Sequence, residues 1–523
     1  MKLSVIGCGY LGAVHAAAMA ELGHEVIGID VDAAKIESLT RGEPTFFEPG
    51  LPEILRSAIA SGRLTFSTRM SDVAGASVHF LAVGTPQQRG SYAADLTYVD
   101  AAVEGLIPFL ADGDLVVGKS TVPVGTAERL AGLVTAGSGA QLAWNPEFLR
   151  EGFAVKDTIS PDRLVYGLPP GEAGVRAKAQ LDEVYAATLA GGTPLVTTDY
   201  ATAELVKVSA NAFLATKISF INAMAEIAEV TGADVTQLAD AIGFDGRIGR
   251  RFLGAGVGFG GGCLPKDIRA FTARAEELGR GESVAFLKEV DKINLRRRDR
   301  VVNLVVDALG GEPYEKRVAV LGLAFKPFSD DIRDSPALDV AVRLHGLGAA
   351  VTATDPEAAA NARRVHPQLT IADSLGEALR DAEVVVLVTE WPEFRGLQPA
   401  TSNCSPPGGP SSTAATRSTR WSGARRGGPM WGWGAPSSPR LIRTAVLERP
   451  ADRARVATTV DLSGEETRRR RTHRRRHHER HARCTPPAAS ARLGHPDLRA
   501  PRRPRAGELQ PLEQRGHRPR RPV

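Results

Sequence analysis

The chain opens with the stretch KLSVIGCGYLG at residues 2–12, and this stretch decides the fold. An apolar strand pattern at residues 3–6 runs into a GxGxxG turn, and a helical pattern follows. In such a turn Gly7 permits the sharp bend, Gly9 lets a phosphate group approach the backbone, and Gly12 lets the helix pack closely on the strand. The order of strand, glycine turn and helix predicts the first βαβ unit of a Rossmann-like domain.

An acidic residue after the next strand pattern indicates which dinucleotide binds. The strand pattern at residues 25–29 ends at Asp30, 18 residues after Gly12. A carboxylate there accepts hydrogen bonds from a ribose diol and repels a 2′-phosphate, so we predict NAD as the cofactor and not NADP. The helix N-terminus supplies N–H groups for the pyrophosphate. The alternative is a glycine turn with a purely structural role.

Strand and helix patterns alternate along the rest of the first 400 residues. Further strand patterns lie at residues 78–83, 115–118, 140–143, 164–166, 317–322, 350–354 and 383–388, and a long helical pattern occupies residues 201–230. We therefore predict an α/β protein with two Rossmann-like, doubly wound parallel-sheet domains joined by a central helical domain. The predicted segments are residues 1–198, 199–300 and 313–397, followed by an aberrant Arg/Pro-rich tail at residues 398–523 that we expect to be disordered.

Charge is distributed very unevenly along the 523 residues, although the formal net charge is only +5. Residues 401–523 hold 27 Arg, no Lys and nine acidic residues, whereas residues 1–400 carry a net charge of −13. The high proportion of Arg is therefore a property of the tail, and it does not indicate that the whole protein binds nucleic acid.

Several classes of protein are excluded by the same sequence. The apolar runs are too short for a membrane span. Met1 leads directly into the first strand pattern, which leaves no room for a signal peptide and predicts a cytoplasmic protein. The four cysteines lie far apart with no CxxC pair, so we predict neither a disulfide framework nor a metal site.

The stretch GFGGGCLPKD at residues 258–267 is the best candidate for the chemical centre. Its glycines let the backbone approach a ligand, and Lys266 and Asp267 give Cys263 the surroundings expected of a reactive thiolate. A thiolate beside a nicotinamide suggests that an aldehyde is oxidised through a thiohemiacetal and a thioester. The alternative is that Cys263 is a small buried apolar residue.

Other polar clusters follow predicted strands or share one helix face. Hydroxyl groups lie in KSTVPVGT at residues 119–126, and two carboxylates lie in NPEFLREG at residues 145–152. Glu204, Lys207 and Asn211 are spaced i, i+3, i+7 and so share one face of the long helix. Lys326 follows the first strand of the second α/β unit, where it could meet a phosphate. A solvated helix face or an interdomain network is the structural alternative for these clusters.

Taken together, these motifs make the chain resemble the UDP-glucose/GDP-mannose dehydrogenase family over roughly residues 1–397. The resemblance also includes EPGL at residues 48–51, VGTP at residues 83–86 and DIRDSP at residues 331–336. It implies a four-electron oxidation of a nucleotide sugar's primary alcohol to a carboxylate with two NAD. It also implies an NAD-binding first domain, a homodimer built on the central helical domain, and a UDP-sugar-binding last domain that is truncated here.

The resemblance further implies roles for individual residues. Lys207 is the expected base or oxyanion partner of the first oxidation, Asn211 helps to hold the oxyanion, and Cys263 captures the aldehyde. Glu147, Asp267 and Thr121 are the candidates to orient and activate the hydrolytic water. The expected cofactor-binding residues are Gly7, Gly9, Tyr10, Leu11, Gly12, Asp30, Lys35, Thr85, Thr121, Glu151, Lys266 and Arg333. The expected substrate-binding residues are Phe148, Leu149, Glu151, Lys207, Asn211, Arg247, Phe252, Leu253, Gly256, Gly260 and Lys326, of which Arg247 reaches the substrate of the neighbouring subunit.

Within the family we expect UDP-glucose as the substrate, because the stretch at residues 252–262 is closest to that type. GDP-mannose or a UDP-N-acetylhexosamine remains the alternative, and so does an impaired nucleotide-binding remnant whose basic tail mediates interactions.

The tail departs from the family pattern. Family members carry an Asp-Gly-Arg-Asn loop whose Arg holds the substrate, and no such loop follows Trp391. A shifted reading frame over residues 411–428 permits VDGRNALDPVEWRAAGW, so we hypothesise a frameshift near residues 397–398. The rival hypothesis is a disordered basic tail in which residues 468–476 bind nucleic acid or acidic lipid.

Overall fold

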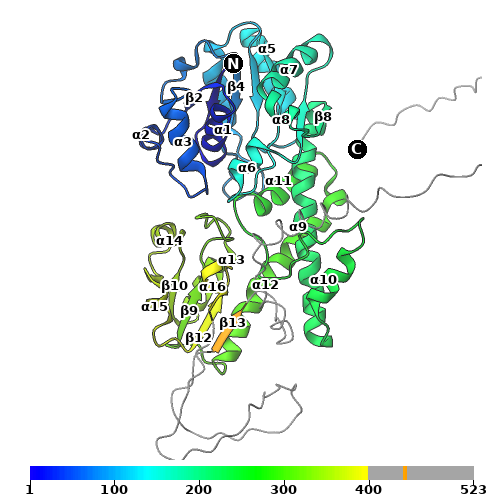
Figure 1. Cartoon of the computed structure of the whole chain (residues 1–523). Helices are drawn as coiled ribbons and strands as arrows, with labels where there is room; N and C mark the ends of the chain where they lie inside the picture. The colour runs from blue at the N-terminus through cyan, green and yellow to red at the C-terminus, as the bar shows by residue number, and fades with distance from the viewer. Residues whose placement is uncertain (398–439, 444–523) are drawn as a thin grey trace, which may run out of the picture. The chain divides into compact units, whose positions relative to one another are not determined.

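The computed structural model describes residues 1–397 and 440–443 (Figure 1). Its N-terminal α/β unit is built on an eight-stranded sheet in the order β3-β2-β1-β4-β5-β6-β7-β8. The strands are β1 Lys2–Ile6, β2 Glu25–Ile29, β3 Leu64–Ser67, β4 Val78–Leu81, β5 Leu115–Gly118, β6 Gln141–Trp144, β7 Leu164–Gly167 and β8 Leu195–Thr198. Neighbouring strands are parallel except β6 and β7, which are antiparallel.

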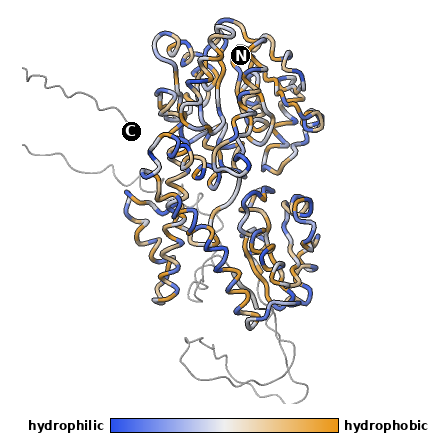
Figure 2. The backbone as a smooth tube through the Cα atoms, turned by 180° about the vertical axis from the view of Figure 1, so that it is seen from behind, coloured by the Kyte–Doolittle hydropathy of each residue, from blue (hydrophilic) through white to orange (hydrophobic). Residues whose placement is uncertain are grey.

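Helices cover this sheet, which explains why its strands are apolar. They are α1 Tyr10–Glu21, α2 Ala33–Thr40, α3 Leu51–Ala60, α4 Thr97–Leu106, α5 Thr126–Ser138, α6 Ala154–Ile159, α7 Gly171–Val184 and α8 Ala186–Ala190, with 3₁₀ turns at Met70–Val73 and Ile107–Phe109. Strands β4, β5 and β7 are buried at every position. In Figure 2 the strands inside this unit are coloured mainly as hydrophobic, as expected when both faces of a parallel sheet are covered.

The central helices follow the first unit. Helix α9 spans Tyr200–Thr231, and it begins where the Asp199 side chain accepts a hydrogen bond from Thr202 N. It ends at Gly232, whose φ of 74° is left-handed and favours glycine. Helices α10 Val235–Gly243, α11 Leu264–Glu277 and α12 Phe286–Ala308 follow, with a 3₁₀ turn at Gly281–Val284, and all three contact α9. The predicted long helix and central helical region are therefore confirmed.

The second α/β unit has a five-stranded parallel sheet in the order β11-β10-β9-β12-β13. Its strands are β9 Arg317–Leu321, β10 Ala350–Thr354, β11 Thr370–Ile371, β12 Val384–Leu387 and β13 Arg440–Arg443, and its helices are α13 Pro336–Gly346, α14 Ala359–Val365, α15 Leu375–Leu379 and α16 Pro392–Arg395. The edge strand β13 belongs to the tail that we expected to be disordered. The frameshift region at residues 397–428 lies outside the described residues apart from its first position.

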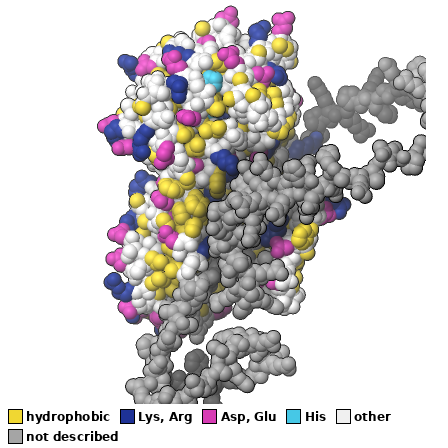
Figure 3. All heavy atoms as spheres, in the orientation of Figure 1, with side chains coloured by type: hydrophobic (Ala, Val, Ile, Leu, Met, Phe, Trp, Pro, Cys, Tyr) yellow, Lys and Arg dark blue, Asp and Glu magenta, His cyan; other side chains and the backbone are white. Residues whose placement is uncertain are grey.

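Two observations bear on the classes of protein that the sequence argues against, namely nucleic-acid-binding and membrane proteins. On the face of the N-terminal α/β unit seen in Figure 3, basic and acidic side chains are interspersed. Among the helices of residues 1–397 and 440–443, none combines the length and apolar character that a membrane crossing needs.

Candidate active site

The glycine turn after β1 has the geometry of a dinucleotide cradle. Gly7 has a φ of 90° and its N–H donates to Ile29 O at 2.7 Å. A Cβ atom on Gly12 would lie 1.8 Å from Gly7 O, so only glycine lets α1 begin so close to β1. A Cβ on Gly9 would meet nothing within 4 Å. The turn is therefore closed on the protein side at Gly7 and Gly12 and open at Gly9, which fits a bound pyrophosphate.

Asp30 is held at the end of β2 and is buried. Its Oδ2 accepts hydrogen bonds from Cys8 N at 2.8 Å and Lys35 Nζ at 2.9 Å, and its Oδ1 accepts one from Asp32 N at 3.0 Å. Lys35 therefore compensates the Asp30 charge and fixes the carboxylate beside the glycine turn. This arrangement fits a carboxylate that accepts the hydroxyls of an NAD ribose.

Tyr10 and Leu11 have contacts that the sequence did not reveal. The Tyr10 hydroxyl donates to Glu48 Oε2, and Glu48 in turn accepts hydrogen bonds from Gly152 N at 2.6 Å and Ala154 N at 2.7 Å. Because Ala154 begins α6, this buried carboxylate ties α1 to the start of α6. Tyr10 is therefore held in position by Glu48. Leu11 lines the pocket behind the turn at residues 145–149.

Two polar pairs bring α9 to the candidate chemical centre. Lys207 Nζ lies 2.8 Å from Glu147 Oε1 in the turn after β6. Asn211 Nδ2 donates to Asp267 Oδ2 on α11 at 2.7 Å. Lys207, Asn211 and Asp267 are all buried. The expected sharing of one face by Glu204, Lys207 and Asn211 is confirmed, because α9 is helical over all three positions at this spacing and all three are buried.

Glu204 has a structural contact at the start of α5. Its two carboxylate oxygens accept hydrogen bonds from Gly125 N at 2.8 Å and Ala127 N at 2.7 Å. These N–H groups belong to the first turn of α5, where the helix leaves donors without intrahelical partners. Glu204 therefore caps α5 and fixes α9 against the N-terminal α/β unit.

Cys263 directly precedes α11 at the edge of this cluster, and its side chain reaches solvent although protein atoms crowd around the sulfur. The structure differs from the thiolate surroundings expected from the sequence. Burial of the thiol among protein atoms and the Glu147 carboxylate raise its pKa to about 12, whereas Lys207 opposes this rise. Lys266 does not supply a free positive charge, because its Nζ lies 2.7 Å from Asp267 Oδ1. In the unliganded protein Cys263 is therefore a neutral thiol at pH 7.

The glycines before Cys263 are explained by protein packing. A Cβ on Gly260 would lie 2.4 Å from Asp334 O, and a Cβ on Gly262 would lie 2.3 Å from the Arg333 guanidinium carbon. Gly261 N donates to Arg333 O at 2.8 Å. We expected these glycines to admit a ligand, but the segment at residues 333–334 occupies the space beside them. Gly256 differs, because a Cβ there would meet nothing within 4 Å.

A second charged group surrounds Glu151. Ser329 Oγ donates to Glu151 Oε2 at 3.1 Å, and Arg333 lies 3.6 Å from Glu151 Oε1 while it also pairs with Asp331. Burial and the Asp331 charge raise the pKa of Glu151 to about 7, against the opposing charges of Arg333 and Lys326. Burial also lowers the pKa of Lys326. A phosphate arriving here would meet Lys326, whereas Arg333 is already paired with two carboxylates.

The remaining predicted residues fall into two groups. Thr85 Oγ1 donates to Thr121 O at 2.8 Å and lies 3.4 Å from Lys266 Nζ, so these three residues are brought together near the chemical centre. Arg247 does not belong to this group, because its side chain is 90% exposed and pairs with Asp245. Phe252 is also exposed and has a left-handed φ of 66°, whereas its neighbour Leu253 is buried.

Comparison with known proteins shows the family to which the chain is similar. Residues 1–189, 201–296 and 319–405 match, respectively, the NAD binding, central and UDP binding domains of the UDP-glucose/GDP-mannose dehydrogenase family. The chain belongs to this family. The match to the NAD binding domain confirms the predicted cofactor, and the match to the UDP binding domain supports a UDP-sugar ligand.

Individual relatives of this dehydrogenase-family chain are similar over most of their length. A UDP-glucose 6-dehydrogenase of Rhizobium meliloti is 43% identical over 401 residues, which are 76% of this chain and 91% of the relative. The structure of a UDP-glucose dehydrogenase from Pyrobaculum islandicum has a TM-score of 0.71 at 41% identity and covers 76% of this chain and 92% of its own. A UDP-D-ManNAc dehydrogenase structure from Pyrococcus horikoshii has a TM-score of 0.66 at 27% identity, with coverage of 76% and 91%.

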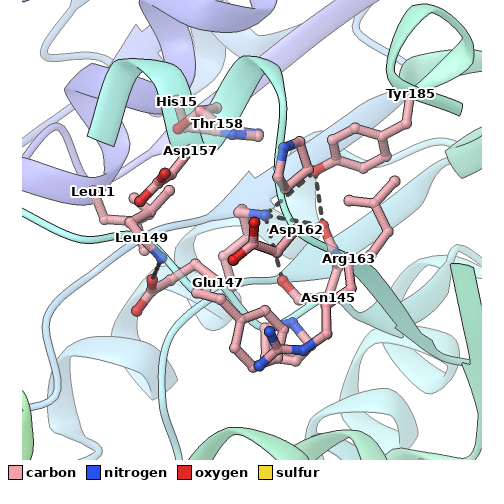
Figure 4. A pocket seen from close by; sticks show the side chains of 15 residues that line it. Leu11, His15, Asn145, Glu147, Leu149, Asp157, Thr158, Asp162, Arg163 and Tyr185 are labelled. Carbon is pink, nitrogen blue, oxygen red and sulfur yellow. Dashed lines mark hydrogen bonds between the residues drawn. The ribbon is translucent and has the colours of Figure 1, made fainter. Parts of the chain in front are cut away.

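Sequence reasoning missed one polar cluster in this family member. Figure 4 shows the pocket behind the turn at residues 145–149, where Asn145 and Tyr185 point toward one another and Glu147 bonds the Leu149 backbone. Lys119 also lines this pocket and is buried. The available signal was a lysine directly after an entirely apolar strand, where a buried cation needs a specific partner. Within the described residues no group of three His, Cys, Asp or Glu could hold a metal ion.

Proposed function

We propose that this chain oxidises UDP-glucose to UDP-glucuronate in a four-electron, NAD-dependent reaction. One observation supports this most directly. Cys263, Lys207 and Glu147 come together in one cluster at the N-terminal end of α11. An alcohol oxidised only to an aldehyde needs no nucleophile, whereas oxidation to an acid can use a covalent thioester. The two similar proteins named as UDP-glucose dehydrogenases support the substrate.

In the first oxidation the sugar's primary alcohol gives up its proton to solvent water, and Lys207 and Asn211 stabilise its oxygen as it becomes an oxyanion. Although burial lowers it, the pKa of Lys207 is raised overall, chiefly by the Glu147 carboxylate, so this side chain is an ammonium that can donate a hydrogen bond. This favours an oxyanion partner over a base. The glycine turn, Asp30 and the group around Thr85 would hold NAD, which would supply the hydride acceptor for both oxidations.

In the second stage the Cys263 sulfur bonds to the aldehyde carbon, and its proton passes to a neighbouring base. Glu147 is a candidate for this base, because its charge contributes to the raised pKa of the thiol. Loss of the second hydride converts the thiohemiacetal to a thioester. Glu147, Asp267 and Thr121 are then the groups that orient and activate the hydrolytic water.

The deciding experiment measures NADH formed per sugar by the purified chain. UDP-glucose should yield two NADH per molecule, and GDP-mannose and a UDP-N-acetylhexosamine should react far more slowly. Preferred turnover of a UDP-N-acetylhexosamine would favour the alternative that the similarity to the Pyrococcus protein raises. The variant Cys263→Ser should block release of the acid and retain a sugar ester or aldehyde, and normal turnover by this variant would refute the covalent route.

The tail carries a separate proposal. We infer a frameshift near residues 397–398 that removed a substrate-binding Arg loop, so the 523-residue form should have a raised KM for the sugar. Sequencing the coding region for residues 390–440 tests this, and an intact in-frame reading rejects it. The rival basic tail predicts salt-dependent binding to nucleic acid or acidic vesicles, which residues 1–397 alone should lack.

We further propose that the protein is a cytoplasmic homodimer built on α9. Phe213, Phe220 and Ile227 lie seven residues apart on this helix and are 66%, 48% and 53% exposed. A stripe of large apolar side chains at this spacing marks one helix face, and such a face favours a second copy of the same helix.

A further inference from the structure

Lys119 is buried behind the turn that carries Glu147, and its ammonium is tied to the residue that begins this turn. Its Nζ donates to Asn145 Oδ1 at 2.9 Å and lies 3.4 Å from Asn145 O and 3.3 Å from Tyr185 OH. The Tyr185 hydroxyl also donates to Asn145 Oδ1, at 2.7 Å. Asn145 Nδ2 donates to Val165 O at 2.9 Å. Every polar atom of the Asn145 side chain is therefore fixed.

This arrangement is costly to the fold, which argues against a purely stabilising role. Lys119, Asn145 and Tyr185 are 6%, 1% and 2% exposed. None of the three hydrogen-bond acceptors of Lys119 is a carboxylate, so the ammonium is desolvated without a contacting counter-ion. Burial accordingly lowers the pKa of Lys119 to about 8, and the Glu147 carboxylate opposes this. An apolar side chain would fill the same space at lower cost.

The cluster lies where it can determine the direction of the Glu147 side chain. Lys119 follows β5, and Asn145 follows the neighbouring parallel strand β6. Two residues beyond Asn145, Glu147 accepts a bond from Leu149 N at 2.7 Å on one oxygen and meets Lys207 at 2.8 Å with the other. A shift of Asn145 would therefore move Glu147 relative to Lys207 and Cys263.

We propose that Lys119 and Tyr185 are positioning residues that hold the turn at residues 145–147, so that Glu147 faces the Cys263 thioester during hydrolysis. The inference rests on the proposed function. In this step the water oxygen bonds to the thioester carbon and one water proton passes to the Glu147 carboxylate. The carbon–sulfur bond breaks, and the sulfur leaves with its electron pair and regains a proton. The products are the sugar carboxylic acid and the Cys263 thiol.

The test compares three single variants by rapid mixing with UDP-glucose and NAD. Lys119→Met should lower kcat by about tenfold to a hundredfold without raising the KM for UDP-glucose. Because hydrolysis becomes limiting, NADH should appear in a burst, and mass spectrometry should find the sugar bound to Cys263. Tyr185→Phe should give the same pattern with a smaller loss, about threefold to tenfold, because Lys119 still bonds Asn145.

The matched control is Tyr166→Phe. It removes another buried tyrosine hydroxyl, which bonds Leu181 O at 3.3 Å and not Asn145, so it should keep kcat and show no burst. Thermal unfolding of all three variants identifies any that fail to fold. If Lys119→Met does not fold, Tyr185→Phe against Tyr166→Phe still decides the inference.

A double-mutant cycle separates positioning of Glu147 from a general structural effect. In a Glu147→Gln background, Lys119→Met and Tyr185→Phe should change the hydrolysis rate by less than about twofold, because the group through which they act is gone. Losses that multiply fully in the double variants would overturn the inference, as would slower turnover without a burst. A wild-type chain that forms no NADH with any nucleotide sugar would instead contradict the proposed function itself.

Discussion

Lys207 Nζ lies 2.8 Å from Glu147 Oε1, and the two side chains are only 6% and 13% exposed. The pair joins α9 to the turn after β6 at the point where Cys263 reaches the site. Breaking one member of such a buried pair leaves the other charge without compensation. In the proposed mechanism the ammonium of Lys207 would serve two purposes, because it would donate a hydrogen bond to the substrate oxygen and it also holds Glu147 in place.

Replacing Lys207 with Met should slow the first oxidation more than any other step. Loss of the donor removes stabilisation of the developing oxyanion, so the first-turnover rate of NADH formation should fall by about 10²–10⁴-fold. Stopped-flow absorbance measures this rate. Lys292→Met on α12 is the control, because that side chain is 67% exposed and pairs with Glu289 on the same helix. A first-turnover rate in Lys207→Met within fivefold of wild type would contradict the assignment.

The raised pKa of Cys263 predicts how the thiol reacts in the absence of substrate. Alkylation by iodoacetamide requires the thiolate, so its rate should rise about tenfold per pH unit between pH 7 and pH 10. Peptide mapping assigns the adduct, and Cys8 serves as an internal control because it is fully buried. Lys207→Met should slow alkylation further, since a positive neighbour is removed. A rate that levels off below pH 9 would show that the thiol is already ionised there.

Local patterns were sufficient to predict the fold class and the cofactor turn. The missed strands were β3, β8, β11 and β13. Most positions of β3 and all positions of β8 are exposed or half-buried, and β11 has only two residues. The antiparallel pairing of β6 with β7 could not be predicted either, because strand spacing alone does not give the direction in which a strand returns to the sheet.

The residue types at the site could also be predicted from the sequence, but the charges that surround them could not. Lys266 looked like a cation for Cys263, and only the fold reveals that Asp267 pairs with it. Gly260 was attributed to a ligand, yet its neighbour is the Asp334 carbonyl, more than 70 residues away in the chain. The Gly260 outcome depends on a tertiary contact, on which a local sequence pattern carries no information. The pairing of the neighbours Lys266 and Asp267 depends on the directions of their side chains, which the residue types alone do not give.

Glu151 predicts an unusual dependence of stability on pH. Its folded-state pKa is raised from 4.5 to about 7 by burial and by Asp331. Between these values the native protein keeps a proton that the unfolded chain releases, so this group lowers stability as pH rises through the window. Glu151→Gln imitates the protonated form and should raise the free energy of unfolding at pH 8 by at most about 3 kcal/mol.

Denaturant unfolding at two pH values checks this expectation. At pH 4.5 the Glu151→Gln variant and the wild type should differ little, because most of the native carboxyl is already protonated. Glu172→Gln on α7 is the control, since its side chain is 97% exposed and it should have no effect at either pH. Equal stability of Glu151→Gln and the wild type at pH 8 would contradict the raised pKa.

The stripe on α9 predicts the oligomeric state. Phe213→Glu and Phe220→Glu should each convert a dimer to a monomer, because a charge would be buried without a partner at the centre of the contact. Sedimentation velocity at micromolar concentration measures the change. Val175→Glu on α7 is the matched control, since Val175 is 71% exposed but lies on the N-terminal α/β unit and not on α9. A wild-type monomer, or a dimer that survives both substitutions, would reject α9 as the interface.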